Sequence, residues 1–157
     1  MKAATVSTLK KELNDRSPQE LVELCLRLAK FKKENKELLT YLLFEASDEM
    51  AFIEGVKQEM DEQFEQINTK SYYFIKKSLR KILKNVKKYI RYSKKKETEV
   101  DLLIYFCLKL KRFSPSYRRS TVLVNLYNRQ LGLIRKTVAT LDEDLQYDYG
   151  EELKAFD

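Results

Sequence analysis

The chain has 157 residues and a formal net charge of +7, and its contents of 43% hydrophobic and 35% charged residues are typical of a soluble globular protein. It contains no histidine, which excludes Ser-His and Cys-His nucleophile pairs and His-containing metal sites. Only three glycines and two prolines are present, too few for the turns of a strand-rich protein, so we expect helices throughout. The length suits a single all-α domain over residues 1–157.

The first two predicted helices carry start signals. Thr5 or Ser7 can cap a short helix, and residues 17–20 (Ser-Pro-Gln-Glu) form a capping box with proline at the first helical position. The second helix should run to about Lys33 and turn one apolar face to the core. That face consists of Leu21, Leu24, Cys25, Leu28 and Phe31.

The region 35–67 is also predicted to be helical, as one long helix or as two. Asn35 can cap its start, and residues 38–44 are nearly apolar all round, which is typical of a helix in the middle of a bundle. Ser47 and Asp48 offer a break, after which residues 48–67 form an acidic helix.

The next predicted helix is uniformly basic on its polar side. Between Glu65 and Glu97 the chain has twelve lysines and arginines and no acidic residue, so residues 66–96 carry a net charge of +12. At about 100° per residue, these cations lie opposite the apolar series of the same helix. The resulting cationic stripe, our candidate anion-binding site, consists of Lys76, Lys77, Arg80, Lys81, Lys84, Lys87, Lys88, Arg91, Lys94 and Lys95. Its central row is Arg80, Lys84, Lys87 and Arg91.

Three further segments complete the chain. Residues 98–101 (Thr-Glu-Val-Asp) resemble a capping box and open a helix that ends at Ser114-Pro115, where the next helix starts. The acidic segment 142–157 is a short terminal helix or a tail, with Gly150 as an interruption. A secondary basic cluster surrounds the Ser114-Pro115 turn, near the start of the basic helix if the two helices before the turn are antiparallel. It consists of Lys109, Lys111, Arg112, Arg118 and Arg119.

Six or seven helices with short connections predict antiparallel helical hairpins. Because the helices come in pairs, we favour an α-α superhelix resembling two or three HEAT-like repeats, with a compact helical bundle as the alternative. The resemblance concerns the architecture and implies no functional residue.

No motif for catalysis is present: there is no phosphate-binding loop, and Cys25 and Cys107 cannot supply a four-cysteine zinc site. One enzymatic alternative uses acidic residues at helical spacing, which can bind Mg²⁺ through oxygen atoms. These residues are Glu45, Asp48, Glu49, Glu59, Glu62 and Glu65. The pattern resembles the acidic turns of all-α nucleotide pyrophosphohydrolases of the MazG type, which implies Mg²⁺-dependent hydrolysis. Alternatively, these acidic residues form a solvent-exposed helix face that has no catalytic activity and binds no cofactor. We prefer this interpretation.

The cationic stripe predicts a non-catalytic module that binds an acidic protein or the backbone of a nucleic acid. Anionic lipid fits less well, because the apolar face of this helix is needed for the core. Alternatively, acidic residues of 45–65 and 142–152 neutralise the stripe internally. Four tyrosines border the stripe and can stack on bases if they are exposed. They are Tyr72, Tyr73, Tyr92 and Tyr117.

Cys25 and Cys107 each lie in an apolar helical run, which predicts two buried thiols in a reducing compartment, although a disulfide between them stays open. The N-terminus is too polar for a signal peptide and no segment has the apolar length of a membrane span, so we expect a cytoplasmic protein. Nothing in the sequence indicates an oligomeric state.

Overall fold

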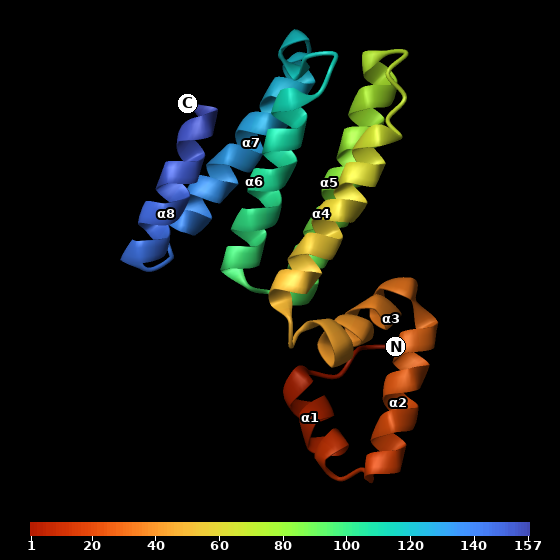
Figure 1. Cartoon of the computed structure of the whole chain (residues 1–157). Helices are drawn as coiled ribbons and strands as arrows, with labels where there is room; N and C mark the ends of the chain where they lie inside the picture. Colours follow the sequence, from red (N-terminus) through yellow and green to blue (C-terminus); the bar gives the residue numbers. More distant parts are fainter. The chain divides into compact units, whose positions relative to one another are not determined.

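The computed structural model describes all residues from Met1 to Asp157 and contains helices and no strands (Figure 1). The α-helices are α1 (Val6–Asn14), α2 (Pro18–Phe31), α3 (Lys33–Thr40), α4 (Glu49–Glu65), α5 (Tyr72–Ser93), α6 (Lys96–Arg112), α7 (Thr121–Val138) and α8 (Glu143–Leu153). A π-helical segment, Tyr41–Glu45, lies between α3 and α4, and short 3₁₀ helices span Tyr117–Arg119 and Lys154–Phe156. The predicted all-α fold is confirmed.

Contacts within the chain divide it into two compact units, Met1–Phe44 and Glu45–Asp157. The first unit contains α1 to α3 and the second contains α4 to α8. Almost the whole apolar core belongs to the second unit, since Ala29 and Tyr41 are the buried residues of the first. Folding of residues 1–157 as one domain stays a prediction.

The helices α1 and α2 begin at caps that the sequence predicted. Thr5 accepts a hydrogen bond from the Thr8 amide at 3.2 Å, and the Ser17 hydroxyl accepts one from the Glu20 amide at 3.2 Å. Asn35 is not a cap, in contrast to the prediction. It lies within α3, where its side-chain amide donates to the carbonyl oxygen of Leu28 at 2.7 Å and so ties α3 to α2.

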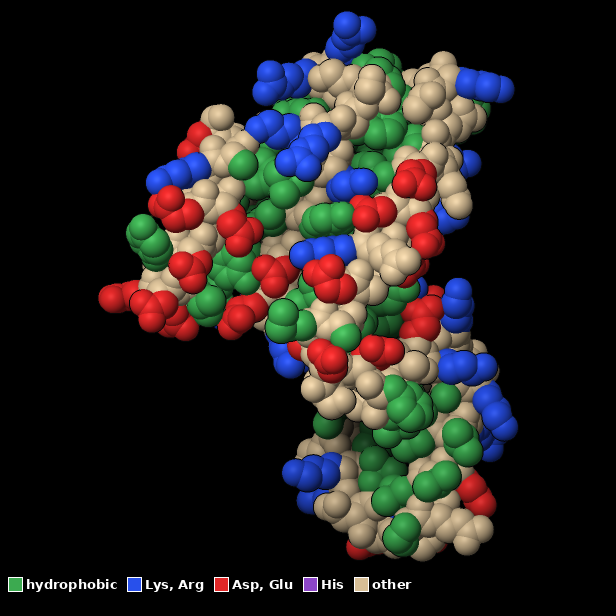
Figure 2. Space-filling view, in the orientation of Figure 1, with side chains coloured by type: hydrophobic (Ala, Val, Ile, Leu, Met, Phe, Trp, Pro, Cys, Tyr) green, Lys and Arg blue, Asp and Glu red, His purple; other side chains and the backbone are tan.

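The apolar faces of the first unit are more exposed than the sequence predicted. Leu28 and Phe31 of α2 are 62% and 77% exposed, and Cys25 is exposed as well. The apolar run that follows α3 does not lie inside this unit either, since Leu42 and Phe44 are 58% and 72% exposed. Within the unit, α2 packs mainly against α3, and this contact leaves much of the apolar surface of α2 exposed. Hydrophobic side chains are therefore visible across this part of the surface (Figure 2).

The second unit is a helical bundle built around α6. This helix packs against α4, α5 and α7, and α8 packs against α7 (Figure 1). The central position explains why α6 is apolar on several sides, with Val100, Leu102 and Phe106 fully buried. The bundle alternative is thus confirmed, whereas a HEAT-like superhelix stays a prediction.

Some of the predicted helix boundaries are confirmed and others differ. Residues 35–67 form two helices, and Asp48 caps α4 by accepting a hydrogen bond from the Ala51 amide at 3.1 Å. The helix α6 begins at Lys96, so Thr98 is not its cap but a fully buried residue of the first turn.

The C-terminal part also departs from the predicted boundaries. After Pro115 the chain makes a 3₁₀ turn, and α7 begins at Thr121 with Ser120 as its cap. The acidic C-terminal segment forms α8, which continues through Gly150 without interruption. None of the helices combines the length and the apolar character that crossing a membrane requires.

Candidate functional site

The helix α5 anchors its apolar face in the bundle. Ser71 caps its start by accepting a hydrogen bond from the Phe74 amide at 3.5 Å, and Lys94 ends it with a left-handed conformation at φ 60°. Between these ends, Ile75, Leu79 and Val86 are no more than 1% exposed. They pack where α5 contacts α4 and α6, so the opposite side of α5 faces away from both neighbouring helices.

The central row of the cationic stripe lies on that outward side. Arg80, Lys84, Lys87 and Arg91 are all exposed, and none of them makes an ion pair or a side-chain hydrogen bond. Elsewhere in the stripe, Lys95 forms an ion pair with Glu49 at 3.4 Å, while Lys76 and Lys88 are half-buried. The stripe therefore has an open centre, and the role of its residues in anion binding stays a prediction.

The acidic residues of α4 are directed to partners other than the central row. Glu59 accepts hydrogen bonds from Asn85 at 2.9 Å and from the Tyr89 hydroxyl at 2.7 Å, both neutral groups of α5. Asp61 pairs with Lys109 of α6 at 3.1 Å and accepts a hydrogen bond from Tyr105 at 2.7 Å. Burial by itself would raise the pKa of Asp61, but the Tyr105 hydroxyl and Lys109 together hold it below its usual value.

The acidic residues of the C-terminal segment lie on the other side of the bundle. In Figure 1, α8 lies beside α7, whereas α5 lies behind α4. Acidic side chains gather at the start of α8 in the space-filling view (Figure 2). Within the segment, Glu151 pairs with Lys154 at 2.7 Å and Asp157 pairs with Arg135 at 3.2 Å. Internal neutralisation therefore does not reach the central row, whereas Lys95 at the end of the stripe pairs with Glu49.

The secondary basic cluster lies at the head of α5, as antiparallel packing predicted. The Tyr72 hydroxyl donates to the carbonyl oxygen of Ser116 at 2.9 Å and holds the turn against the first turn of α5. Lys109 is engaged by Asp61, and the Lys111 ammonium donates to the carbonyl oxygen of Ala155. The remaining members of the cluster, Arg112, Arg118 and Arg119, are exposed.

Only one of the four tyrosines near the stripe is exposed. Tyr92 and Tyr117 are buried, Tyr72 is half-buried with its hydroxyl bonded to Ser116, and Tyr73 is 68% exposed. Tyr73 precedes Arg80 by seven residues, about two helical turns, so both lie on the same side of α5. The spacing of Tyr73 and Arg80 in the sequence already indicates that they share one side of the helix. Whether the Tyr73 ring is exposed depends on the packing around the start of α5.

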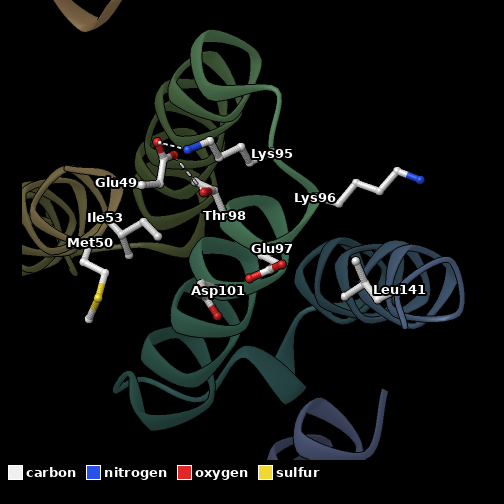
Figure 3. Close-up of a pocket in the computed structure, with 9 residues that line it drawn as sticks. All are labelled: Glu49, Met50, Ile53, Lys95, Lys96, Glu97, Thr98, Asp101 and Leu141. Carbon is white, nitrogen blue, oxygen red and sulfur yellow. Dashed lines mark hydrogen bonds and ion pairs between the residues drawn. The ribbon is translucent and has the colours of Figure 1, made fainter. Parts of the chain in front are cut away.

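The opposite end of α5 is held by a polar contact that the sequence did not indicate. Glu49 accepts a hydrogen bond from the buried hydroxyl of Thr98 at 2.8 Å and forms the ion pair with Lys95 (Figure 3). It also accepts a hydrogen bond from the buried hydroxyl of Ser93 at 2.5 Å. The carboxylate thereby joins α4 to the connection between α5 and α6. A hollow of about 530 Å³ lies beside it, and Asp101 lines its wall.

The acidic residues considered as Mg²⁺ ligands do not converge. Asp48 caps α4, Glu49 holds the connection between α5 and α6, and Glu59 accepts bonds from α5. No three acidic or cysteine side chains in the chain are arranged to hold a metal ion. Burial raises the pKa of Asp101 despite a hydrogen bond from Tyr149 at 2.9 Å, and it also raises the pKa of Glu152.

The two cysteines have different surroundings and both are free thiols. Cys107 is fully buried in α6, as predicted, and burial raises the pKa of its thiol to about 12. The prediction of burial was wrong for Cys25, which is exposed on α2, as are Leu24 and Leu28 of the same helix.

No protein-family model, curated protein or solved structure significantly matches this chain. Function is therefore inferred from its own residues and their arrangement.

Proposed function

We propose that the Glu45–Asp157 unit is a binding module in which α5 presents the cationic stripe to an anionic macromolecule, an acidic protein or a nucleic acid backbone. The observation that carries this proposal is the central row, in which Arg80, Lys84, Lys87 and Arg91 are exposed and have no acidic partner. The apolar face of the same helix is occupied by α4 and α6, so the stripe can bind a ligand without disturbing the core.

The charge pattern favours binding over general solubility. Like charges three or four residues apart on a helix destabilise it by roughly 0.2–0.5 kcal/mol per pair. Surfaces that serve solubility mix both signs and avoid this repulsion, whereas no acidic residue occurs between Glu65 and Glu97. A bound polyanion would relieve the repulsion and release its own condensed counterions.

The dimensions of the central row suit an extended polyanion. From Arg80 to Arg91 the helix rises about 16 Å, at roughly 1.5 Å per residue. Successive cations of the row are separated by about one turn, so each can contact a different anionic group of a chain. Arg118 and Arg119 are exposed near the head of α5 and offer a continuation of this path.

A charge-matched pair of variants tests the proposal. Replacing the four residues of the central row by glutamine should sharply lower the salt concentration that elutes the protein from a heparin column. The control replaces Lys10, Lys11, Lys30 and Lys136, four exposed lysines without ion pairs, by glutamine and should elute close to the wild type.

Both variants lose the same net charge, so only the position of the charges differs. Circular dichroism should show unchanged helix content in the central-row variant, because the replaced side chains make no contact that the fold requires. Equal loss of retention in the two variants would show that heparin senses net charge alone and would contradict a dedicated site on α5.

A further inference from the structure

We infer that the anionic partner is a single-stranded nucleic acid, and that Tyr73 stacks on one of its bases at the head of the stripe. This inference rests on the proposed function, because it identifies the ligand of the same surface. It is carried by the position of one exposed aromatic ring relative to a row of unpaired cations.

Tyr73 shares the outward side of α5 with the central row. It precedes Lys77 by four residues and Arg80 by seven, which are the spacings of neighbours along one side of a helix. Its side chain is 68% exposed and its hydroxyl makes no hydrogen bond. What sets Tyr73 apart from other exposed rings, such as that of Tyr147 on α8, is its position on the same side of the helix as the central row.

The ring stands on an ordered part of the helix. Ser71 caps the first turn, and the hydroxyl of Tyr72 is bonded to the carbonyl oxygen of Ser116 at 2.9 Å. Phe74 contacts the Tyr73 ring edge-to-face, with 5.4 Å between the ring centroids and 75° between the planes. A ring on a fixed backbone loses little conformational freedom on stacking, which favours its use as a binding platform.

The aromatic ring distinguishes a nucleic acid from an acidic protein. The face of an aromatic ring carries partial negative charge, so it gives no attraction to the carboxylates of an acidic peptide. A nucleobase instead offers a flat π-face that stacks on Tyr without regard to sequence. In a duplex the bases already stack on one another, whereas in a single strand their faces are open to Tyr73.

The cations next to the ring are placed to receive the flanking phosphates. Lys76 and Lys77 follow Tyr73 by one turn, and Arg80 and Lys84 continue the same side of the helix. A strand whose base lies on Tyr73 can therefore run along α5 with its backbone over the central row. The combination of a cationic track and an aromatic platform is the usual design of proteins that bind single strands without sequence preference.

The binding test uses the full chain and a fluorescently labelled oligothymidylate of about 15 nucleotides. Tyr73→Ala should weaken binding about 5- to 100-fold, the range expected for the loss of one base-stacking ring. Tyr73→Phe should bind like the wild type, because stacking needs the ring and not the hydroxyl. The matched control is Tyr147→Ala, which removes a tyrosine of 70% exposure from α8 and should leave binding unchanged.

A second measurement reports stacking directly. The chain has no tryptophan, so Tyr73→Trp introduces a single fluorescent indole at the proposed platform. Its emission should be quenched by the oligothymidylate and not by heparin or polyglutamate, which have no bases. The corresponding control, Tyr147→Trp, should respond to none of the three.

The outcomes separate this inference from the proposed function. If the central-row variant loses oligothymidylate binding but Tyr73→Ala does not, the stripe binds polyanions and the stacking inference falls. If polyglutamate binds the wild type more tightly than the oligothymidylate does, the partner is an acidic protein and the inference is again overturned. If the wild type binds neither polyglutamate nor the oligothymidylate nor heparin, both proposals fail.

Discussion

Several carboxylates in this protein hold neighbouring helices together through hydrogen bonds and ion pairs. Glu49 is the clearest example, since its carboxylate takes hydrogen bonds from Ser93 and Thr98 and pairs with Lys95. Its side chain is only 16% exposed, so these groups satisfy one another in a largely water-free setting. In the same way, Asp61 is held by Tyr105 and Lys109 rather than by the stripe.

Replacing Glu49 by alanine should therefore destabilise the protein. The substitution leaves two buried hydroxyl groups without their acceptor, which we expect to cost about 2–4 kcal/mol of unfolding free energy. Urea unfolding followed by circular dichroism measures the loss. Glu49→Gln, which keeps an acceptor oxygen, should lose less, and Glu54→Ala at an exposed position of the same helix should lose almost nothing. Equal stability of Glu49→Ala and Glu54→Ala would contradict the role of the contact.

At the scale of the element, α5 has one apolar face and one cationic face. One face is buried against α4 and α6, and the other holds the unpaired central row. The helix ends at Ser93, and the next residue, Lys94, adopts a left-handed conformation that is usually found at glycine. An L-residue with a Cβ atom is strained in that conformation by roughly 1 kcal/mol.

Lys94→Gly should therefore stabilise the protein by roughly 0.5–1 kcal/mol, because glycine adopts the left-handed conformation without a steric cost. Thermal unfolding should show a higher midpoint than for the wild type. Lys94→Ala removes the same charge and keeps the Cβ atom, so it separates the backbone effect from the relief of charge repulsion. A glycine variant no more stable than the alanine variant would refute the backbone explanation.

At the scale of the whole molecule, the two units differ in the amount of core that they contain. Apart from Ala29 and Tyr41, the buried apolar residues all belong to Glu45–Asp157. The helices of Met1–Phe44 are short, and isolated helices of such length are marginal in water. The apolar side chains that remain exposed in this unit, such as Phe31, give it little burial to offset the entropy of folding.

Residues 45–157 produced alone should consequently fold into a helical unit with one cooperative thermal transition and should keep the heparin retention of the full chain. Residues 1–44 produced alone should lose their helix signal gradually on heating, without a cooperative transition. Circular dichroism of the two fragments measures both. A fragment 45–157 that is unfolded would mean that the first unit supplies an essential part of the fold.

The sequence by itself determined the features that depend on neighbours along the chain. The cap at Ser17, and the cap at Thr5 for which Ser7 was the alternative, follow from side chains that bond to backbone amides three residues later. The sequence also predicts that the cationic stripe and the apolar face lie on opposite sides of α5, because the helical repeat alone sets the position of each residue around the axis. These interactions are local, so no knowledge of the rest of the fold is needed to predict them.

Only the tertiary structure decided which of these surfaces are covered and by what. It buried Thr98 against Glu49 where the sequence suggested a cap, left Leu28 and Phe31 uncovered, and exposed Tyr73 among four tyrosines of similar appearance. It also directed Glu59 and Asp61 away from the central row. Each of these outcomes depends on which helices pack together, and such packing joins residues far apart in sequence whose proximity no local pattern records.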